Sequence, residues 1–215
     1  MPDLNFIVEK ASAVPYAASP LLNFTLKIQD TETGPVHAVA LRCQIRIEPT
    51  RRKYDPPEQS QLVDLFGEPA RWGQTLHAML WTHAAVVVPS FEGSTTIELP
   101  VPCTYDFNLA ATKYFHALEN GEVPLNLLFS GTIFHEGEDG RLQVAQISWE
   151  KECTFRLPVK VWKDMMEMYY PNSAWLCLRK DAFDALYQYK SSLALPTWEA
   201  AIEKLIENSG EKVGT

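Results

Sequence analysis

The sequence predicts an α+β fold: an antiparallel β-sandwich-like body with inserted short helices and a helical C-terminal subdomain. Two runs in the first quarter of the chain alternate apolar and polar residues with a period of two, which is typical of half-buried strands. A strand, a helix and a second strand follow one another between residues 99 and 132. After Pro158 the apolar residues change to a helical spacing. With 215 residues, 46% of them hydrophobic and 21% charged, the chain can bury a substantial core.

The clearest strands lie at residues 22–29 and 39–48. Their apolar positions are Leu22, Phe24, Leu26 and Ile28 in the first, and Val39, Leu41, Cys43, Ile45 and Ile47 in the second. A turn ending in Gly34-Pro35 joins them, so they form either a hairpin or consecutive strands of a sandwich. A shorter alternation at residues 4–8 predicts an N-terminal strand.

An excursion with helix signals follows Pro49. Asp55 is a good N-cap, prolines occupy the first turn after it, and Gly67 is a stop signal. A short turn at 68–72, a strand at 76–88 and a strand at 95–99 come next. Helical turns inserted between strands at the end of a sheet form a rim, which is either a binding mouth or a lid over the core.

Residues 99–132 are the expected centre of the topology. Alternation runs to Leu109, and Pro100 and Pro102 place this strand at a sheet edge or a bend, because proline cannot donate to a ladder. A helix of about three turns is predicted from an N-cap at Asn108 to a stop at Gly121. The apolar run 123–134 predicts a buried strand, so the helix spans two sheets or sheet edges.

The remaining chain predicts a hairpin turn at 136–140, returning strands to 155, and helices at 161–169, 182–189 and 197–206. We therefore expect a β-rich body over residues 1–158, a helical subdomain packed on it over 159–209, and a frayed tail over 210–215.

Charge and targeting signals narrow the function classes. A net charge of −8 argues against nucleic acid, whose phosphates are bound by Lys and Arg. The N-terminus lacks a signal-peptide pattern and no apolar run approaches the length of a membrane span, which predicts a soluble cytoplasmic protein without membrane insertion. The four cysteines form no Cys-x-x-Cys motif, so buried reduced thiols are expected.

The candidate pocket combines histidines with a polar group at the strand-to-helix change. His77 and His83 share a parity on one strand, with Trp81 between them; the alternative is that they are hydrogen-bonded histidines without a ligand. The other candidates could surround an anion at a helix N-terminus, although Asp106 could equally make a local turn bond and the tyrosines could be core edges. The six residues are His77, His83, Tyr105, Asp106, Tyr114 and His116. No spacing indicates a metal site or a cofactor.

The candidate interface has two parts. One is the rim with the single basic cluster, and the other is a Met- and aromatic-rich helix whose side chains suit an adaptable interface or, alternatively, the core. Its residues are Arg51, Arg52, Trp72, Trp162, Met165, Met166 and Tyr169.

Seven runs of the chain resemble an uncharacterised bacterial domain family of unknown function. They are Leu41–Pro49, Leu65–Glu68, Leu80–His83, Val101–Asp106, Lys113–Leu118, Phe129–Thr132 and Leu195–Glu199. The resemblance covers nearly the whole chain. Members of that family tend to be encoded beside NiFe uptake hydrogenases of the high-affinity, actinobacterial type, which implies an accessory role in hydrogenase maturation, assembly or docking. The family offers no catalytic residues to transfer.

Two function classes follow. The first is a non-enzymatic accessory protein that contacts a hydrogenase subunit or a maturation factor. The second is a small-ligand-binding protein or enzyme with a polar pocket near His83, Tyr105 and Asp106. The lack of an arranged nucleophile and base favours the first class. A homodimer is left open by the sequence.

Overall fold

The computed structural model describes residues 2–32, 34–137 and 140–209. The chain divides into two compact units, Met1–Trp175 and Leu176–Thr215. The division falls later than the predicted boundary at 158, because helix α5 (Val159–Tyr169) contacts strands β1, β2 and β9 and helix α4 within the first unit. The predicted tail at 210–215 lies outside the described residues, as do residues 138 and 139 of the predicted hairpin turn.

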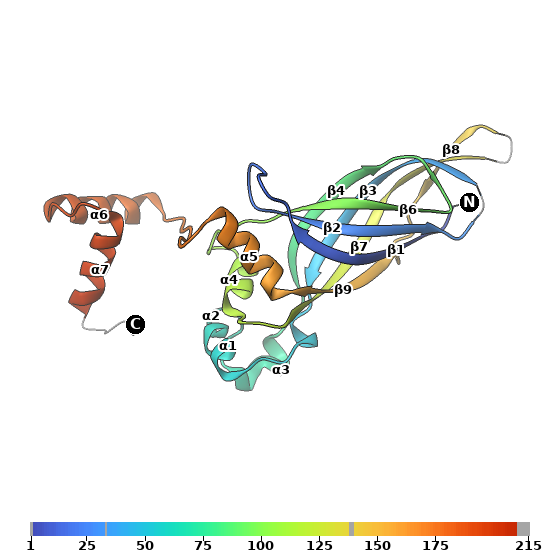
Figure 1. Ribbon diagram of the computed structural model, residues 1–215. Coiled ribbons are helices and arrows are strands. Elements are labelled where there is room, and N and C mark those ends of the chain that lie inside the picture. Colours follow the sequence, from blue (N-terminus) through green and yellow to red (C-terminus); the bar gives the residue numbers. More distant parts are fainter. Residues whose placement is uncertain (1, 33, 138–139, 210–215) are drawn as a thin grey trace. The chain divides into compact units, whose positions relative to one another are not determined.

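The first unit contains two antiparallel sheets (Figure 1). One has the order β1 (Leu4–Ala13), β2 (Leu21–Asp30), β6 (Ser94–Pro102). The other has the order β4 (Met79–Val88), β3 (Pro35–Ile47), β7 (Glu122–Glu136), β8 (Leu142–Gln146). In addition, β9 (Glu152–Pro158) pairs with the first half of β7, and the short β5 (Phe91–Glu92) pairs with β3. The predicted α+β class with an antiparallel body is confirmed.

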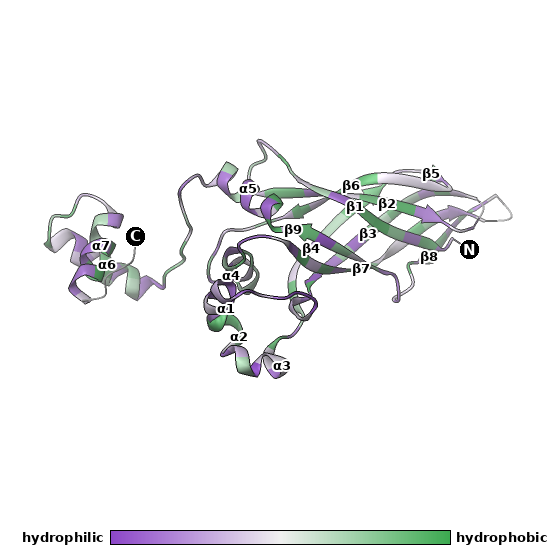
Figure 2. Cartoon of the chain, turned by 60° about the horizontal axis from the view of Figure 1, so that its bottom comes forward, coloured by the Kyte–Doolittle hydropathy of each residue, from purple (hydrophilic) through white to green (hydrophobic). Residues whose placement is uncertain are grey.

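The core lies between the inner faces of these sheets. The apolar positions of both predicted alternating runs are buried, as are Leu4, Phe6 and Val8, and Figure 2 shows hydrophobic and hydrophilic residues alternating along the strands. Phe6 of β1 stacks on Phe129 of β7, with ring centroids 4.2 Å apart, so the two faces meet directly. Because β2 and β3 belong to different sheets, they are consecutive sandwich strands and not a hairpin.

Glycine is required at one position inside the larger sheet. Gly131 of β7 has φ +145°, and a Cβ there would lie 2.1 Å from the Ala40 carbonyl oxygen of β3. Its own carbonyl accepts from the Ile147 amide, where the chain leaves β8. The residue therefore permits close approach of two backbones at the point where β7 changes its partner from β9 to β8.

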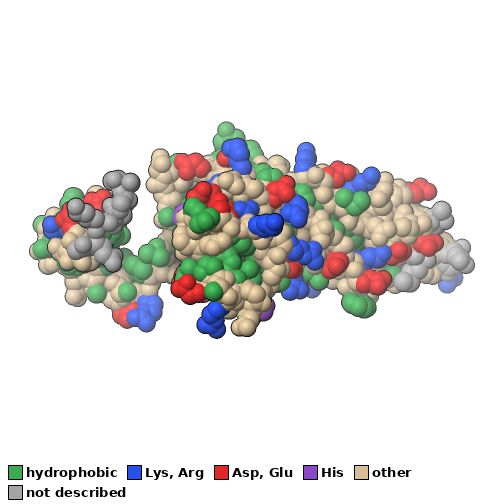
Figure 3. Space-filling model, turned by 90° about the horizontal axis from the view of Figure 1, so that it is seen from below, with side chains coloured by type: hydrophobic (Ala, Val, Ile, Leu, Met, Phe, Trp, Pro, Cys, Tyr) green, Lys and Arg blue, Asp and Glu red, His purple; other side chains and the backbone are tan. Residues whose placement is uncertain are grey.

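The rim forms as predicted after β3. It consists of η1 (Pro49–Arg51), α1 (Pro56–Gln61), α2 (Val63–Phe66), η2 (Pro69–Arg71) and α3 (Trp72–Thr75). The Asp55 carboxylate accepts from the Glu58 amide, 3.0 Å away, and Gly67 ends α2 with φ +71°. Both predicted helix signals are confirmed. In the view from below, apolar side chains gather over this part of the molecule (Figure 3).

The central stretch joins the two sheets. β6 is an edge strand, as its prolines predict, and it ends at Pro102, so the predicted continuation to Leu109 is wrong. The Cys103 amide donates to the Pro20 carbonyl, and residues 104–109 then turn instead of extending. Helix α4 (Ala110–Ala117) has Leu109 and not Asn108 at its N-cap position. It leads into β7 in the other sheet, which confirms that the helix spans two sheets.

The second unit contains α6 (Lys180–Ser192) and α7 (Trp198–Ser209). Ala194 follows α6 with φ +50°, and the Leu195 amide donates to the Lys190 carbonyl across the helix end. Thr197 Oγ1 accepts from the Ala200 amide at 3.1 Å, which confirms the predicted cap of the last helix. The rings of Phe183, Tyr187 and Trp198 lie 5.4 to 6.4 Å apart between the two helices.

Candidate functional site

His77, Trp81 and His83 do not lie on one face of a strand, as the candidate pocket requires. His77 lies before β4 and is exposed. In the pairing of β3 with β4 the register shifts so that Trp81 has no partner of its own. This bulge turns Trp81 into the core, 4.8 Å from the Phe115 ring, while His83 stays exposed. A bulge reverses side-chain parity, so the shared-face argument fails.

Tyr105 and Asp106 lie in the turn between β6 and α4. Asp106 accepts from the Asn108 amide at 2.9 Å, which is the local turn bond named above as its alternative. Tyr105 stacks on Tyr170 with ring centroids 5.8 Å apart and meets the edge of Trp162. Burial, and next the charge of Glu167, raise the pKa of the Tyr105 phenol. These contacts describe a packed turn.

Tyr114 and His116 point to different surroundings. Tyr114 is fully buried, and its hydroxyl lies 2.7 Å from that of Tyr54 in the rim. Burial raises the pKa of Tyr114 well above its ordinary value. His116 is partly exposed and meets the Phe107 ring edge-on at 4.7 Å. Its partial burial, and next the charge of Lys163, lower the pKa of its imidazole. The six predicted residues are thus not gathered around one cavity.

A groove does open close to the predicted pocket, lined by other residues. It has a volume of about 380 Å³ and lies between the start of β4, the end of β6 and the first turn of α4. Its lining residues are Leu80, Trp81, Thr82, Pro102, Thr104, Leu109, Ala110, Ala111, Thr112, Phe115 and Trp162. The period-two pattern of β4 is the sequence signal closest to this groove. It does not reveal the bulge at Trp81, so the sequence alone did not locate the groove.

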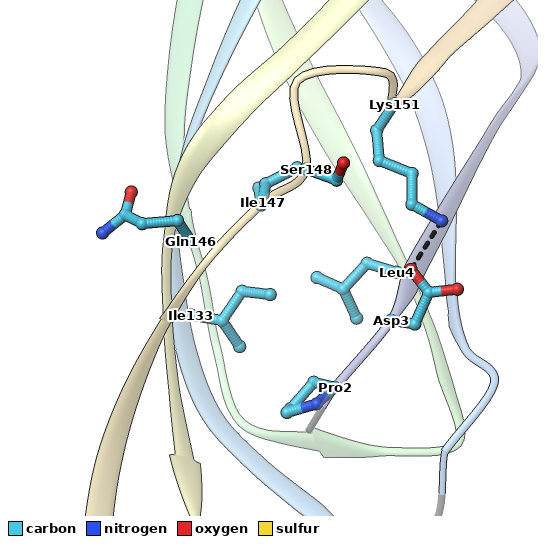
Figure 4. Close-up of a pocket in the computed structure, with 8 residues that line it drawn as sticks. All are labelled: Pro2, Asp3, Leu4, Ile133, Gln146, Ile147, Ser148 and Lys151. Atoms are coloured by element: carbon cyan, nitrogen blue, oxygen red, sulfur yellow. Dashed lines mark ion pairs between the residues drawn. The ribbon is translucent and has the colours of Figure 1, made fainter.

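A smaller cavity of about 120 Å³ lies between the start of β1 and the loop that joins β8 to β9 (Figure 4). Leu4, Ile133 and Ile147 give it an apolar interior. Lys151 pairs with Asp3 at 2.6 Å at the side of this cavity. The bond from Lys151 lowers the pKa of Asp3, and the opposing effect of burial is too small to cancel it. The space is small for an organic ligand, since ligand pockets usually measure about 300–1,000 Å³.

The predicted interface helix belongs to the core. Trp162, Met165 and Met166 are at most 2% exposed, and the Trp162 ring stacks on Phe115 at 4.9 Å. Tyr169 fastens the loop between β1 and β2: its hydroxyl donates to the Val14 carbonyl and accepts from the Ala17 amide. The interpretation of these three buried residues as a docking surface is wrong, because the same helical spacing serves a helix packed on a sheet.

The rim residues of the predicted interface divide. Arg51 is exposed, but Trp72 is buried and donates through Nε1 to the Gly67 carbonyl. Arg52 pairs with the buried Glu58, donates to the carbonyls of Asn120 and Glu122, and thereby joins the rim to the end of α4. Glu58 also accepts from the Glu119 amide at 2.9 Å. This pair stabilises the attachment of the rim and is not available for docking.

Several large apolar side chains of the second unit are exposed. Within its described residues Ala201 is the one buried hydrophobic side chain. The exposed large hydrophobic residues are Leu176, Leu178, Phe183, Tyr187, Leu193, Ile202 and Leu205, each at least 41% exposed. The sequence analysis recognised these helices but not their exposure, because apolar spacing does not reveal whether a partner element exists.

In the part of the chain that is described, no three His, Cys, Asp or Glu side chains come together as metal ligands would. None of the described helices is long and apolar enough to cross a bilayer.

Comparisons with known proteins give a family and little else. Residues 1–214 match the model of a family of unknown function, DUF6084. No curated protein matches the chain. One similar solved structure is the crystal structure of the "Putative ApaA Protein from Bordetella pertussis", which is 16% identical over 73% of this chain and 95% of that chain, with a TM-score of 0.24. A similarity that weak supports no inference about fold or function. The chain therefore belongs to the family of unknown function DUF6084, whose model spans almost all of its length.

Proposed function

We propose that the protein is a non-enzymatic, cytoplasmic accessory protein that acts by binding another protein. One observation carries the proposal: the helix pair α6–α7 exposes four large apolar side chains, Phe183, Tyr187, Ile202 and Leu205, each at least 41% exposed. A patch of this kind on a folded protein is typical of an interaction site.

The energetics of the helix pair support this proposal. Fully burying an exposed Leu or Phe side chain contributes about 1.5–3 kcal/mol. The side chains of the pair are 41 to 55% exposed, so covering each of them would contribute roughly half of that, and covering several would stabilise a complex. Amphipathic helices commonly bind by placing such residues in the groove of a partner. Several charged residues of α6 and α7 form ion pairs within their own helix, as Lys180 does with Asp184 and Lys204 with Glu207. The exposed apolar side chains are therefore the groups of the two helices that gain most from contact with a partner.

The partner class follows from the family resemblance given by the sequence. We propose a subunit of a NiFe hydrogenase, or a maturation factor for it, as the protein that covers the helix pair. The alternative of a polar pocket near His83, Tyr105 and Asp106 gains no support, since the nearby groove is lined by Leu80, Trp81 and Thr104 instead.

Affinity capture tests the proposal directly. The tagged full-length protein is recovered from its own cells, grown so that the hydrogenase is expressed, beside the double variant Ile202→Asp and Leu205→Asp. A matched control carries Glu203→Ala, an exposed polar site on the same helix. Hydrogenase subunits or maturation factors should co-elute with the wild type and the control in stoichiometric amount, and be lost from the double variant.

Two results would count against the proposal. One is recovery of the protein alone after gentle crosslinking. The other is an equal yield of the same partner with the double variant, which would move the contact away from the helix pair. Size-exclusion chromatography of the free protein identifies a homodimer, and binding of the purified partner to the purified protein then decides between self-association and docking.

A further inference from the structure

The groove in the first unit lies where two sheet edges separate. β4 and β6 are connected by the short segment 89–93 and contact each other, yet they belong to different sheets. Leu80, Trp81 and Thr82 at the start of β4 line the opening, as do Pro102 at the end of β6 and Thr104 just beyond it. The groove is therefore the open end of the seam between the sheets.

The floor of the groove is aromatic and its borders are exposed leucines. Trp81 and Trp162 both pack on Phe115, at 4.8 and 4.9 Å between ring centroids. Leu80 is 49% exposed and Leu109 is 48% exposed. The volume of about 380 Å³ lies within the range of ligand sites, and it suits a bulky apolar side chain with its adjoining backbone.

Unpaired backbone lies beside this pocket. Among the described strands β4 hydrogen-bonds to β3 alone, and β6 hydrogen-bonds to β2 alone. The sheet edge of β4 along Leu80 to Thr82 thus borders an apolar hollow. A free edge next to a side-chain pocket is the arrangement that accepts an extended peptide as an added strand.

Two strands beside the groove, β3 and β4, contain no Asp or Glu, although the net charge of the chain is −8. Arg46 lies opposite the groove residue Leu80 in the ladder and makes no ion pair with any described residue. On the other side, β6 contributes Glu98, whose carboxylate accepts from Thr25 Oγ1 at 2.9 Å.

From the free edge, the aromatic hollow and the neighbouring Arg46 together, we propose that this groove binds an extended segment of a partner protein that carries a bulky apolar residue next to an Asp or Glu. The apolar side chain occupies the hollow over Trp81, Phe115 and Trp162. The segment pairs its backbone with β4, and its carboxylate meets Arg46. This site is separate from the exposed helix pair and does not depend on it.

Peptide selection tests the site with the full-length protein. A display library of random 12-residue peptides is selected on the wild type after subtraction on Leu80→Glu, and recovered peptides are measured by fluorescence polarisation. The control variant is Val87→Glu, since Val87 is 70% exposed at the far end of the same strand. Circular dichroism and thermal melting verify that every variant is folded.

We expect enriched peptides that combine Phe, Leu or Trp with neighbouring acids. They should bind Leu80→Glu and Arg46→Glu at least tenfold more weakly than the wild type, with Val87→Glu unchanged. In ¹⁵N spectra of the wild type, the shifted amides should include those of β4 from Leu80 to His83.

Several outcomes would overturn the proposal. These are enrichment of basic peptides, absence of any peptide that distinguishes the wild type from Leu80→Glu, and peptide binding that shifts only amides outside β4, β6 and α4. A dimer of the wild type that dissociates in Leu80→Glu would identify a second copy as the occupant. Competition by free indole together with absence of peptide binding would identify a small aromatic ligand.

Discussion

The two units of this protein bury apolar residues to very different extents. In the first unit two sheets and α5 enclose a core that includes Phe24, Phe115 and Trp162, all at most 2% exposed. In the second unit two helices of ordinary length bury only Ala201 among the described hydrophobic residues. Both units have regular secondary structure, and each has a helix with a side-chain N-cap, Asp55 in the first unit and Thr197 in the second. The difference teaches that an apolar pattern specifies an element, whereas stability depends on what covers its apolar face.

Core truncation should show the largest difference between the units. Phe24→Ala should lower the free energy of unfolding of the first unit by about 4 kcal/mol, because it removes a fully buried ring that contacts Trp81 and Phe155. Leu205→Ala should change stability by less than about 0.5 kcal/mol, since Leu205 is 42% exposed. Urea denaturation followed by tryptophan fluorescence and circular dichroism measures both. Equal losses for the two variants would refute the contrast.

The buried ion pair of the rim should come next. Arg52→Ala leaves Glu58 buried without its partner and removes donors to two carbonyls, so a loss of about 3 kcal/mol is expected. Its neighbour Arg51 is exposed, and Arg51→Ala should cost no more than about 0.5 kcal/mol. Thermal melting compares the two variants. An unchanged melting temperature for Arg52→Ala would mean that the rim is not held by this pair.

A smaller effect, of opposite sign, is expected in the helix pair. Ala194 adopts φ +50° after α6, a conformation that glycine adopts without the steric cost of a Cβ. Ala194→Gly should therefore stabilise the end of α6 by about 1 kcal/mol. Slower amide exchange in α6 and α7 would show this gain, and faster exchange would contradict it. Thr197→Ala, which removes the cap of α7, is the matched variant of opposite sign.

A further effect concerns alkaline pH and the first unit. Burial raises the pKa of the Cys103 thiol to about 12 and that of the Tyr54 phenol to about 12, from ordinary values of 9.0 and 10.0. Above those ordinary values the unfolded chain has lost protons that the folded chain retains. Stability is therefore complete below about pH 9 and falls as pH rises toward 12.

Urea denaturation at pH 8 and pH 11 checks this prediction. Cys103→Ala and Tyr54→Phe should each make the loss between the two pH values smaller. A pH dependence identical to that of the wild type would assign the loss to other groups.

The sequence predicted those parts of the fold where a local pattern is compatible with only one kind of structure. Strands β2 and β3 alternate without interruption, and Asp55 and Gly67 have the chemistry of helix ends, so these features were correct. The strand boundary beyond Pro102 was missed because residues 105–109 alternate as a strand does, although a side-chain bond of Asp106 turns the chain.

The candidate site depended on long-range features that a local pattern does not contain. The bulge at Trp81 arises from pairing with β3 and reverses the side on which His83 lies. Met165 and Met166 have a spacing that fits a core or an interface equally well, and only the packing of α5 against β1 and β2 decides between them. The exposed apolar side chains of α6 and α7 were missed because helical spacing does not show how far the two helices bury each other's apolar residues.

Hydrogen exchange of the full-length chain, alone and with its captured partner, is the most direct test of the proposed division between a stable body and a helix pair that needs a partner. Protection should reach the global free energy of unfolding in β2, β3 and β7, and should be far weaker in α6 and α7 of the free protein. Binding of the partner should raise protection in α6 and α7 by at least tenfold. Protection of α6 and α7 in the free protein equal to that of β3, unchanged by the partner, would contradict the account.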